Sequence, residues 1–266
     1  MFRVLALIVL AGVFLPGSAP AEETVKEFWP ELDLWLNLPA GFRISSFLAL
    51  SHREATDYRE GSFILQADYA WKSGTIPGPR RRLADEAEMA EMKPWLLRWG
   101  YLSGNSLEDD GQEYSEDSGL LELHLRTPLK SGVLLSSRLR SDLRFLGEEH
   151  DFSWRLRYRL MVEKEMVSRG GVSVVPYASV EPFYDNRYEK VSRVRLVGGA
   201  SFGFWKRFAL EGNITYQRDS VSSPEEITAL NLILHVRFRQ RSDSEPNESQ
   251  DRTSEVAGPG RPAVEP

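Results

Sequence analysis

Cysteine is absent from the sequence, and its absence excludes disulfide cross-links, thiolate metal sites and a cysteine nucleophile. A basic excess is absent as well. The formal net charge is -6 and the isoelectric point is near 5.4, which argues against nucleic acid as the main partner. No apolar run in the sequence reaches the ~20 residues of a membrane-spanning helix. A soluble exported protein and a membrane β-barrel are the classes that remain.

Two common motifs of catalysis and binding are also missing. The zinc motif H-E-x-x-H and the phosphate loop G-x-x-x-x-G-K-[ST] do not occur anywhere in the chain. We therefore expect no cofactor and no metal ion, and the sequence nominates no catalytic residue.

The N-terminal segment is typical of a cleavable signal peptide. Arg3 precedes an apolar run over residues 4–15, and small residues follow as far as Ala21. The run is shorter than a membrane-spanning helix requires. We expect cleavage after Ala21, so that residues 1–21 are removed during export.

Alternation of charged and apolar side chains is the main pattern of the chain, and residues 152–160 (FSWRLRYRL) show it most clearly. On a helix, Arg155, Arg157 and Arg159 would be scattered around the cylinder and no apolar face would remain. On a strand, the three arginines share one face and the large apolar residues share the other. The pattern therefore predicts a β-strand.

Similar segments recur between polar, Gly-rich or Pro-containing turns, which is typical of successive antiparallel strands. About eleven can be counted, many of them ten or more residues long, and such lengths suit tilted strands that cross a bilayer. We predict an all-β fold, a single antiparallel up-and-down transmembrane barrel over residues 22–239. Because single-chain bacterial barrels normally have an even number of strands, we expect about twelve, or ten if WLLRWGYL at residues 95–102 belongs to a loop.

Two segments depart from the strand pattern. Residues 80–93 have helix-forming composition and predict a short loop helix, while residues 240–266 lack aromatic residues and any apolar period, which predicts a disordered tail. If the C-terminal end of the barrel lies in the periplasm, the long loop of residues 104–118 faces outward and residues 205–207 form a short periplasmic turn.

The side toward which the charged face points distinguishes two classes. In a soluble β-sandwich that binds an acidic ligand the charged face points outward to water, whereas in a membrane barrel it points into the lumen. A sandwich built from this chain would have roughly twice the usual number of strands, whereas a single barrel can contain all of them. Aromatic residues near the strand ends are typical of the girdles at membrane interfaces. These residues are Trp154, Tyr184, Phe202, Phe204 and Trp205.

Four segments carry a resemblance to a known family. They are RLRSDLR at residues 138–144, RLRYR at 155–159, PYASVEPFY at 176–184 and ALNLILHVRF at 229–238. Together they resemble the family of predicted outer-membrane proteins catalogued as domain of unknown function 2490, over about residues 33–238. The resemblance implies an outer-membrane β-barrel and no established activity. The tail beyond Phe238 and the insert at residues 80–93 depart from the usual barrel pattern.

The charged residues of the alternating strands predict a ladder inside the lumen. Arginine rings favour anions in pores, but acidic residues on the same face also allow an ion-pair network that fills a barrel of this size. The structural role and a narrow anion-preferring channel both remain open. The ladder comprises Arg138, Arg140, Asp142, Arg144, Arg155, Arg157, Arg159, Glu163, Glu181, Arg193, Arg195 and Glu211.

One motif match suggests a different class, an outer-membrane lipid or lipopolysaccharide hydrolase. Residues 199–203 (GASFG) match the nucleophile-elbow string G-x-S-x-G, which needs a strand, a strained turn and a helix around the serine. Here Ser201 lies inside an alternating strand, where glycines more commonly relieve crowding. Of the four histidines, only His124 and His235 fall on the polar face, and we expect hydrogen-bonding roles for both.

The acidic loop at residues 106–117 has some carboxylates at the offsets of a calcium loop, but Ser106 stands where the first aspartate belongs. We expect a solvated loop. Overall, the sequence predicts a protein of the bacterial outer membrane. Its expected partners are membrane lipid, lipopolysaccharide and the barrel assembly machinery, with no nucleic acid among them.

Overall fold

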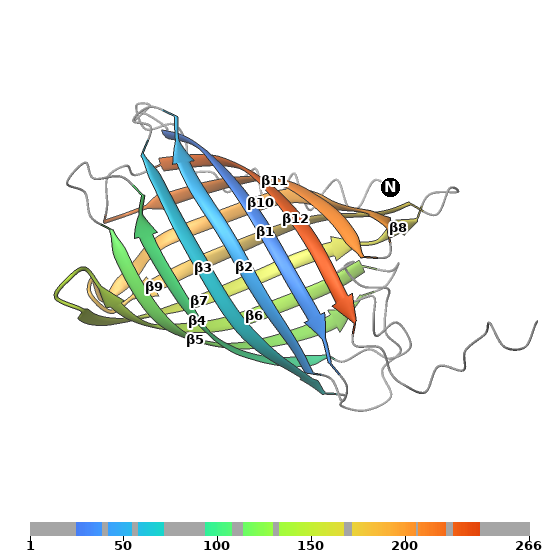
Figure 1. Ribbon diagram of the computed structural model, residues 1–266, viewed down its shortest axis with the longest axis horizontal. Helices are drawn as coiled ribbons and strands as arrows, with labels where there is room; N and C mark the ends of the chain where they lie inside the picture. Colours follow the sequence, from blue (N-terminus) through green and yellow to red (C-terminus); the bar gives the residue numbers. More distant parts are fainter. Residues whose placement is uncertain are drawn as a thin grey trace, which may run out of the picture.

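The computed structural model is an all-β barrel (Figure 1). It describes residues 25–38, 42–54, 58–71, 94–107, 114–129, 133–167, 172–205, 207–221 and 226–239. No helix occurs within these ranges. An apolar helix of membrane-spanning length is likewise absent from these ranges.

The strands follow the alternating segments of the sequence. They are β1 (Val25–Asn37), β2 (Phe42–Arg53), β3 (Arg59–Trp71), β4 (Trp95–Ser106), β5 (Ser115–Pro128), β6 (Val133–Leu146), β7 (Asp151–Lys164), β8 (Met166–Val167), β9 (Ser173–Asp185), β10 (Lys190–Trp205), β11 (Phe208–Asp219) and β12 (Glu226–Arg239). Apart from β8, each has at least 12 residues.

Neighbouring strands in the chain pair antiparallel around the wall, from β1 to β7 and from β9 to β12. The short β8 continues β7 in the same register. Glu163 pairs with Tyr177 and Met166 pairs with Val174, so both segments add to β9 from one side. The described wall therefore consists of eleven strands.

The barrel is closed by a parallel pair. β1 pairs with β12 from Val25 opposite Ile227 to Asn37 opposite Arg239. An odd number of consecutive up-and-down strands brings the first and last strand together pointing the same way, so one parallel contact is unavoidable. The predictions of twelve strands and of ten are both wrong, as is a wholly antiparallel barrel. The segment WLLRWGYL is part of β4 and does not belong to a loop.

The two ends of the barrel are distinguished by their connections. The Gly147 rim comprises the start of β1 and the connections after β2, β4, β6, β9 and β11. The Leu129 rim comprises the connections after β1, β3, β5, β8 and β10 and the end of β12. The ends of β4 and β5 that flank the acidic loop therefore lie at the opposite rim from the end of β10 and the start of β11.

Tight turns join strands at the Gly147 rim. Gly147, with φ of 66°, and His150, with φ of 54°, flank the turn between β6 and β7, and the amide of His150 donates to the Gly147 carbonyl at 3.2 Å. Glu189, with φ of 50°, ends the turn between β9 and β10. Glycine adopts this left-handed region without the steric cost that other residues incur, which explains glycine at position 147.

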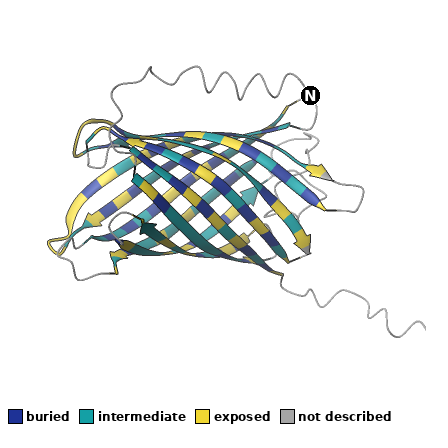
Figure 2. Cartoon of the chain, turned by 90° about the horizontal axis from the view of Figure 1, so that it is seen from above, coloured by how far each residue is buried: buried dark blue, intermediate teal, exposed yellow. Residues whose placement is uncertain are grey.

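Burial alternates along the strands, as the bands of dark blue, teal and yellow in Figure 2 show. On β7, Phe152 is 59% exposed while the adjacent Ser153 is 1% exposed. On β6, Leu143 is 49% exposed while Asp142 is fully buried. The apolar rows thus face outward and the charged rows face the enclosed interior. A two-sheet sandwich with its apolar faces packed together is contradicted by this single closed barrel.

Aromatic side chains gather on the outer face at both rims. Near the Leu129 rim, ring centroids are 4.8 Å apart for Phe42 and Tyr69, and 6.2 Å apart for Trp71 and Trp95. Near the Gly147 rim, Phe145 lies 5.6 Å from Phe152, and Trp154 lies 5.5 Å from Tyr184. The outer face therefore has an aromatic belt at each end, and exposed aliphatic residues such as Leu121, Leu139 and Ile214 lie between the belts together with Tyr158.

Several predicted features fall outside the described residues. They are the signal peptide at residues 1–21, the loop helix at 80–93, the tail at 240–266, the middle of the acidic loop at 108–113 and the side chain of Trp205.

Candidate functional site: the charged barrel interior

The structure places all twelve residues of the predicted ladder on the interior face, where each is buried or lines a cavity. Strand pairing brings arginines together, because Arg138 stands opposite Arg159 and Arg140 stands opposite Arg157. Like charges directly across a strand pair are destabilising unless they are compensated. Carboxylates from β5, β6 and β9 provide that compensation.

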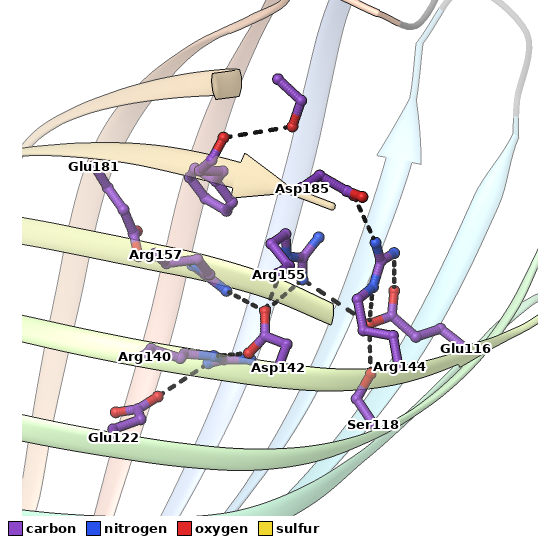
Figure 3. Close-up of polar contacts among 12 residues, drawn as sticks. Glu116, Ser118, Glu122, Arg140, Asp142, Arg144, Arg155, Arg157, Glu181 and Asp185 are labelled. Carbon is purple, nitrogen blue, oxygen red and sulfur yellow. Dashed lines mark hydrogen bonds and ion pairs between the residues drawn. The ribbon is translucent and has the colours of Figure 1, made fainter. Parts of the chain in front are cut away.

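Asp142 is the centre of this network (Figure 3). Its carboxylate accepts hydrogen bonds from Arg140, the neighbour two residues earlier, and from Arg155 Nε at 2.9 Å. Arg157 Nη1 lies 3.9 Å from the same carboxylate. One buried aspartate therefore faces three guanidinium groups, and its charge balances part of theirs.

Glu181 and Glu122 extend the network to the neighbouring strands. Glu181 on β9 accepts hydrogen bonds from Arg138 and from Arg157 Nε, the latter at 2.9 Å. Glu122 on β5 accepts one from Arg140 Nη1 at 3.1 Å. These bonds tie four strands together around the interior. Buried charges are tolerated only when they are paired and hydrogen-bonded in this manner.

A second group closes the network toward the Gly147 rim. Arg144 donates from Nε and Nη2 to both carboxylate oxygens of Glu116, at 2.9 and 2.7 Å, and from Nη1 to Asp185 at 3.1 Å. Asp185 also accepts hydrogen bonds from Arg187 in the turn after β9. This bidentate geometry is the strongest form of arginine–carboxylate pairing.

Two titratable groups lie in the connections of the Gly147 rim, outside the strands. The hydrogen bond from Arg187 to Asp185 raises the pKa of the Arg187 guanidinium. Burial raises the pKa of the Tyr114 hydroxyl, and the neighbouring Glu116 carboxylate raises it further. Arg187 stays positively charged and Tyr114 stays neutral near pH 7.

The remaining ladder residues lie on both sides of this network. Arg193 donates to both oxygens of Asp219 at 2.6 and 2.8 Å, while Arg195 donates to the amide oxygen of Gln217. Glu163 is buried, and Arg159 lines both interior cavities.

A second cluster was not predicted. Asp68 on β3 accepts hydrogen bonds from Arg43 Nε at 2.7 Å and from Arg98 Nε at 2.6 Å. Arg43 also lies over the ring of Trp35, 4.3 Å from its centroid. Arg43 and Asp68 are directly opposite on β2 and β3. Their alternation in the sequence was visible, but their pairing depends on a register that the sequence does not display.

His124 and His235 both point into the interior and contact carboxylates, as expected from their positions. His124 Nε2 lies 2.8 Å from Glu122. His235 Nδ1 lies 2.9 Å from Asp33, and its Nε2 lies 3.3 Å from Glu211.

Ser201 contacts Glu211, the partner of His235, but lacks the context of a nucleophile elbow. It is in the interior of β10, paired on both sides with Val175 and Glu211. Its hydroxyl donates to Glu211 at 2.5 Å. Gly199, two residues earlier on β10, allows a close approach of the strands, because a Cβ there would lie 2.3 Å from the Cβ of Asn213. The glycine therefore has a packing role.

Two cavities formed by the described residues lie in the interior. The larger, about 650 Å³, reaches the Gly147 rim at Arg187 and Tyr188, and the smaller, about 270 Å³, extends toward the Leu129 rim at Arg126 and Arg237. Some residues line both cavities, and we call this shared set the waist. The waist comprises Glu31, Ile64, Arg138, Arg140, Arg159, Met161, Glu211 and Ile233. Its arginines come from β6 and β7, and its acids come from β1 and β11 on the other side of the barrel.

Within the described residues, no group of three or more His, Asp or Glu side chains has the geometry to hold a metal ion. The middle of the acidic loop, where partial calcium-loop spacing occurs, lies outside those residues.

The model of a family described as a protein of unknown function, DUF2490, matches residues 90–228, which include the strands β4 to β11 and the central arginine network. No curated protein matches the sequence.

Proposed function

We infer the role of this chain, which belongs to the DUF2490 family of proteins of unknown function, from its own outer face and interior. We propose that it is a bacterial outer-membrane β-barrel, exported through a signal peptide at residues 1–21. The observation that carries this proposal is the outer face, where exposed leucines and other apolar residues lie between two aromatic belts. An apolar face that extends around a whole barrel is rare on soluble proteins, whereas membrane barrels need one.

A structural role is the first specific function that we propose. The ion pairs among β5, β6, β7 and β9 hold adjacent parts of the wall together through the interior. The outer face would contact membrane lipid and lipopolysaccharide, and insertion would use the barrel assembly machinery.

A narrow anion-preferring channel is the second candidate, and the two cavities favour it. They extend toward opposite rims and share the waist, where Arg138, Arg140 and Arg159 face the interior. Arginines that line a pore raise the local concentration of anions and lower that of cations.

Fractionation tests the membrane assignment. The mature chain should sediment with outer membranes, require detergent for extraction, and migrate faster on a gel before heating than after heating. The physical reason is that a hydrogen-bonded barrel stays folded in mild detergent until it is heated. Recovery of the chain in the soluble periplasmic fraction, without detergent, would refute the proposal.

Planar bilayers separate the two roles. For a channel, we expect small anion-biased conductance steps that lose their bias in the Arg159→Gln variant. The variant Arg218→Gln removes the same charge from an exposed position and should behave like the unmodified chain. Silent bilayers would leave the structural role and eliminate the channel. Lipid hydrolysis that disappears in Ser201→Ala would overturn both in favour of a hydrolase.

A further inference from the structure

Arg195 differs from the other arginines of the interior network. Arg140, Arg144, Arg157 and their neighbours donate hydrogen bonds to carboxylates. The hydrogen bonds of Arg195 go to a neutral group, the amide oxygen of Gln217, from Nε at 3.1 Å and from Nη2 at 2.7 Å. An amide oxygen carries no formal charge, so it satisfies donors of the guanidinium without neutralising it.

Arg195 is also surrounded by like charges. The guanidinium carbons of Arg155, Arg193 and Arg195 lie 5.6, 5.6 and 5.3 Å from the centroid of a single ring, that of Phe183. The ring is 1% exposed, and its electron-rich face attracts cations. Arg157 lies over the same ring at 4.3 Å, so four positive groups surround Phe183, at a cost in mutual repulsion that a bound anion would lower.

Each of the three guanidinium groups keeps a donor available. Arg155 and Arg193 use Nε and Nη2 for Asp142 and Asp219, and Arg195 uses the same two nitrogens for Gln217. Within the described part of the chain, Nη1 of these three residues forms no hydrogen bond. Arginine is suited to recognise phosphate groups because its fork of donors matches their oxygens.

The three arginines line the larger cavity, which reaches the Gly147 rim at Arg187 and Tyr188. Its volume of about 650 Å³ lies in the range of small-molecule pockets. The cavity therefore has room for a phosphate group and for the organic part of a solute. Access is along the barrel axis, since the wall strands are paired around the whole circumference.

We propose that Arg195, Arg155 and Arg193 form a binding site for the phosphate group of a soluble solute that enters the larger cavity from the Gly147 rim. A phosphate has enough oxygens to meet three separate donor groups, whereas a carboxylate has two. The site rests on the barrel and interior of the proposed function, but it requires neither conductance nor a particular membrane.

Calorimetric titration of inorganic phosphate into the folded chain, in neutral-detergent micelles at constant ionic strength, tests the site. We expect one phosphate per barrel and no comparable heat with chloride. Faster migration before heating verifies that every sample is folded. A folded wild-type chain that does not bind phosphate would overturn the inference. The membrane assignment would be unaffected by that result, because fractionation tests it separately.

Two variants and a control locate the site. Arg195→Gln should weaken phosphate binding at least about tenfold, because it removes a charge-assisted donor. Gln217→Glu should weaken it similarly while keeping the arginine, because the new carboxylate neutralises Arg195. Arg218→Gln should bind like the wild type. Wild-type affinity in Gln217→Glu would reject the site even if Arg195→Gln fails to fold.

A last arm distinguishes a soluble solute from a lipid headgroup. Phosphatidylglycerol is added to the micelles in place of inorganic phosphate, and the fluorescence of Trp29, whose ring lies 5.3 Å from the Arg195 guanidinium, is followed against a Trp29→Phe control. We expect the Trp29 signal to respond to inorganic phosphate alone. A response to the lipid alone would contradict a soluble ligand.

Discussion

At the scale of single residues, Asp142 is one of the buried carboxylates that balance the interior arginines. It is completely buried, and three guanidinium groups from β6 and β7 face it. Removing one partner of a buried ion pair costs far more than replacing the whole pair, because the remaining charges stay buried without compensation.

We therefore predict that Asp142→Asn destabilises the barrel by about 3–5 kcal/mol. The substitution keeps the size of the side chain and removes its charge. The measurement is the urea concentration at which the faster-migrating folded band disappears. Asp151→Asn, the same chemical change at an exposed position at the start of β7, should change stability by no more than about 0.5 kcal/mol. Equal effects of the two substitutions would show that Asp142 does not organise the network.

The residues of this network could be predicted from the sequence only in part. Arg155, Arg157 and Arg159 alternate with large apolar residues, so their common face follows from the period of a strand. Their partners do not follow, because Arg144 meets Asp185 across 41 positions and only the strand register brings them together. The cluster of Arg43 and Asp68 was missed for the same reason.

At the scale of strands, the close approach of β10 and β11 depends on one glycine. A Cβ at Gly199 would lie 2.5 Å from the carbonyl oxygen of Gly212, whereas a Cβ at Gly198 would meet no atom within 4 Å. We predict that Gly199→Ala destabilises the barrel by roughly 1–3 kcal/mol, the usual cost of overpacking, and that Gly198→Ala does not. Urea unfolding of both variants checks this, and a harmless Gly199→Ala would mean that the strands separate easily.

A second prediction at this scale concerns the outer face of β6. Leu139 is 45% exposed at the middle of the strand, and we predict that Leu139→Arg destabilises the barrel in phosphatidylcholine vesicles by about 2–4 kcal/mol, because arginine is costly near the bilayer centre. Leu129→Arg, in the connection after β5, should cost only about 0–1 kcal/mol near the interface. Equilibrium folding in urea gives both values. Equal costs at the two positions would argue against a bilayer around β6.

The strands themselves were the most predictable part of the fold. Alternation alone indicated about eleven, which is the number of wall strands in the described residues. The segment WLLRWGYL, whose membership was open, forms part of β4, and its Arg98 turns inward to Asp68. The short β8 has no alternating pattern of its own in the sequence, because it continues β7 beyond Glu165 in the same register.

At the scale of the whole molecule, the odd number of strands places the two ends of the wall on opposite sides. β1 begins at the Gly147 rim and β12 ends at the Leu129 rim. We predict that an epitope tag inserted directly before Val25 and one inserted directly after Arg239 differ in accessibility. Protease added to intact cells should remove only one of the two tags. Equal protection, or equal cleavage, would indicate an even number of crossings.

The expectation of twelve strands failed because it rested on a regularity of other barrels and not on this sequence. An even number lets every pair be antiparallel, but a parallel pair also satisfies the backbone groups of both strands. Here that pair spans the full length of β1, from Val25 to Asn37. Nothing in the alternation of a single strand distinguishes a parallel neighbour from an antiparallel one.

The parallel pair of β1 and β12 also determines when the barrel can close during folding. Val25 and Ile227 come from opposite extremes of the described chain, and contacts between such distant residues form late, since a long loop must close first. A nascent polypeptide that lacks β12 would keep two unpaired edges, which are templates for aggregation. Completion of this barrel therefore waits for its final strand, and the intermediate before that step is the one that most needs a chaperone.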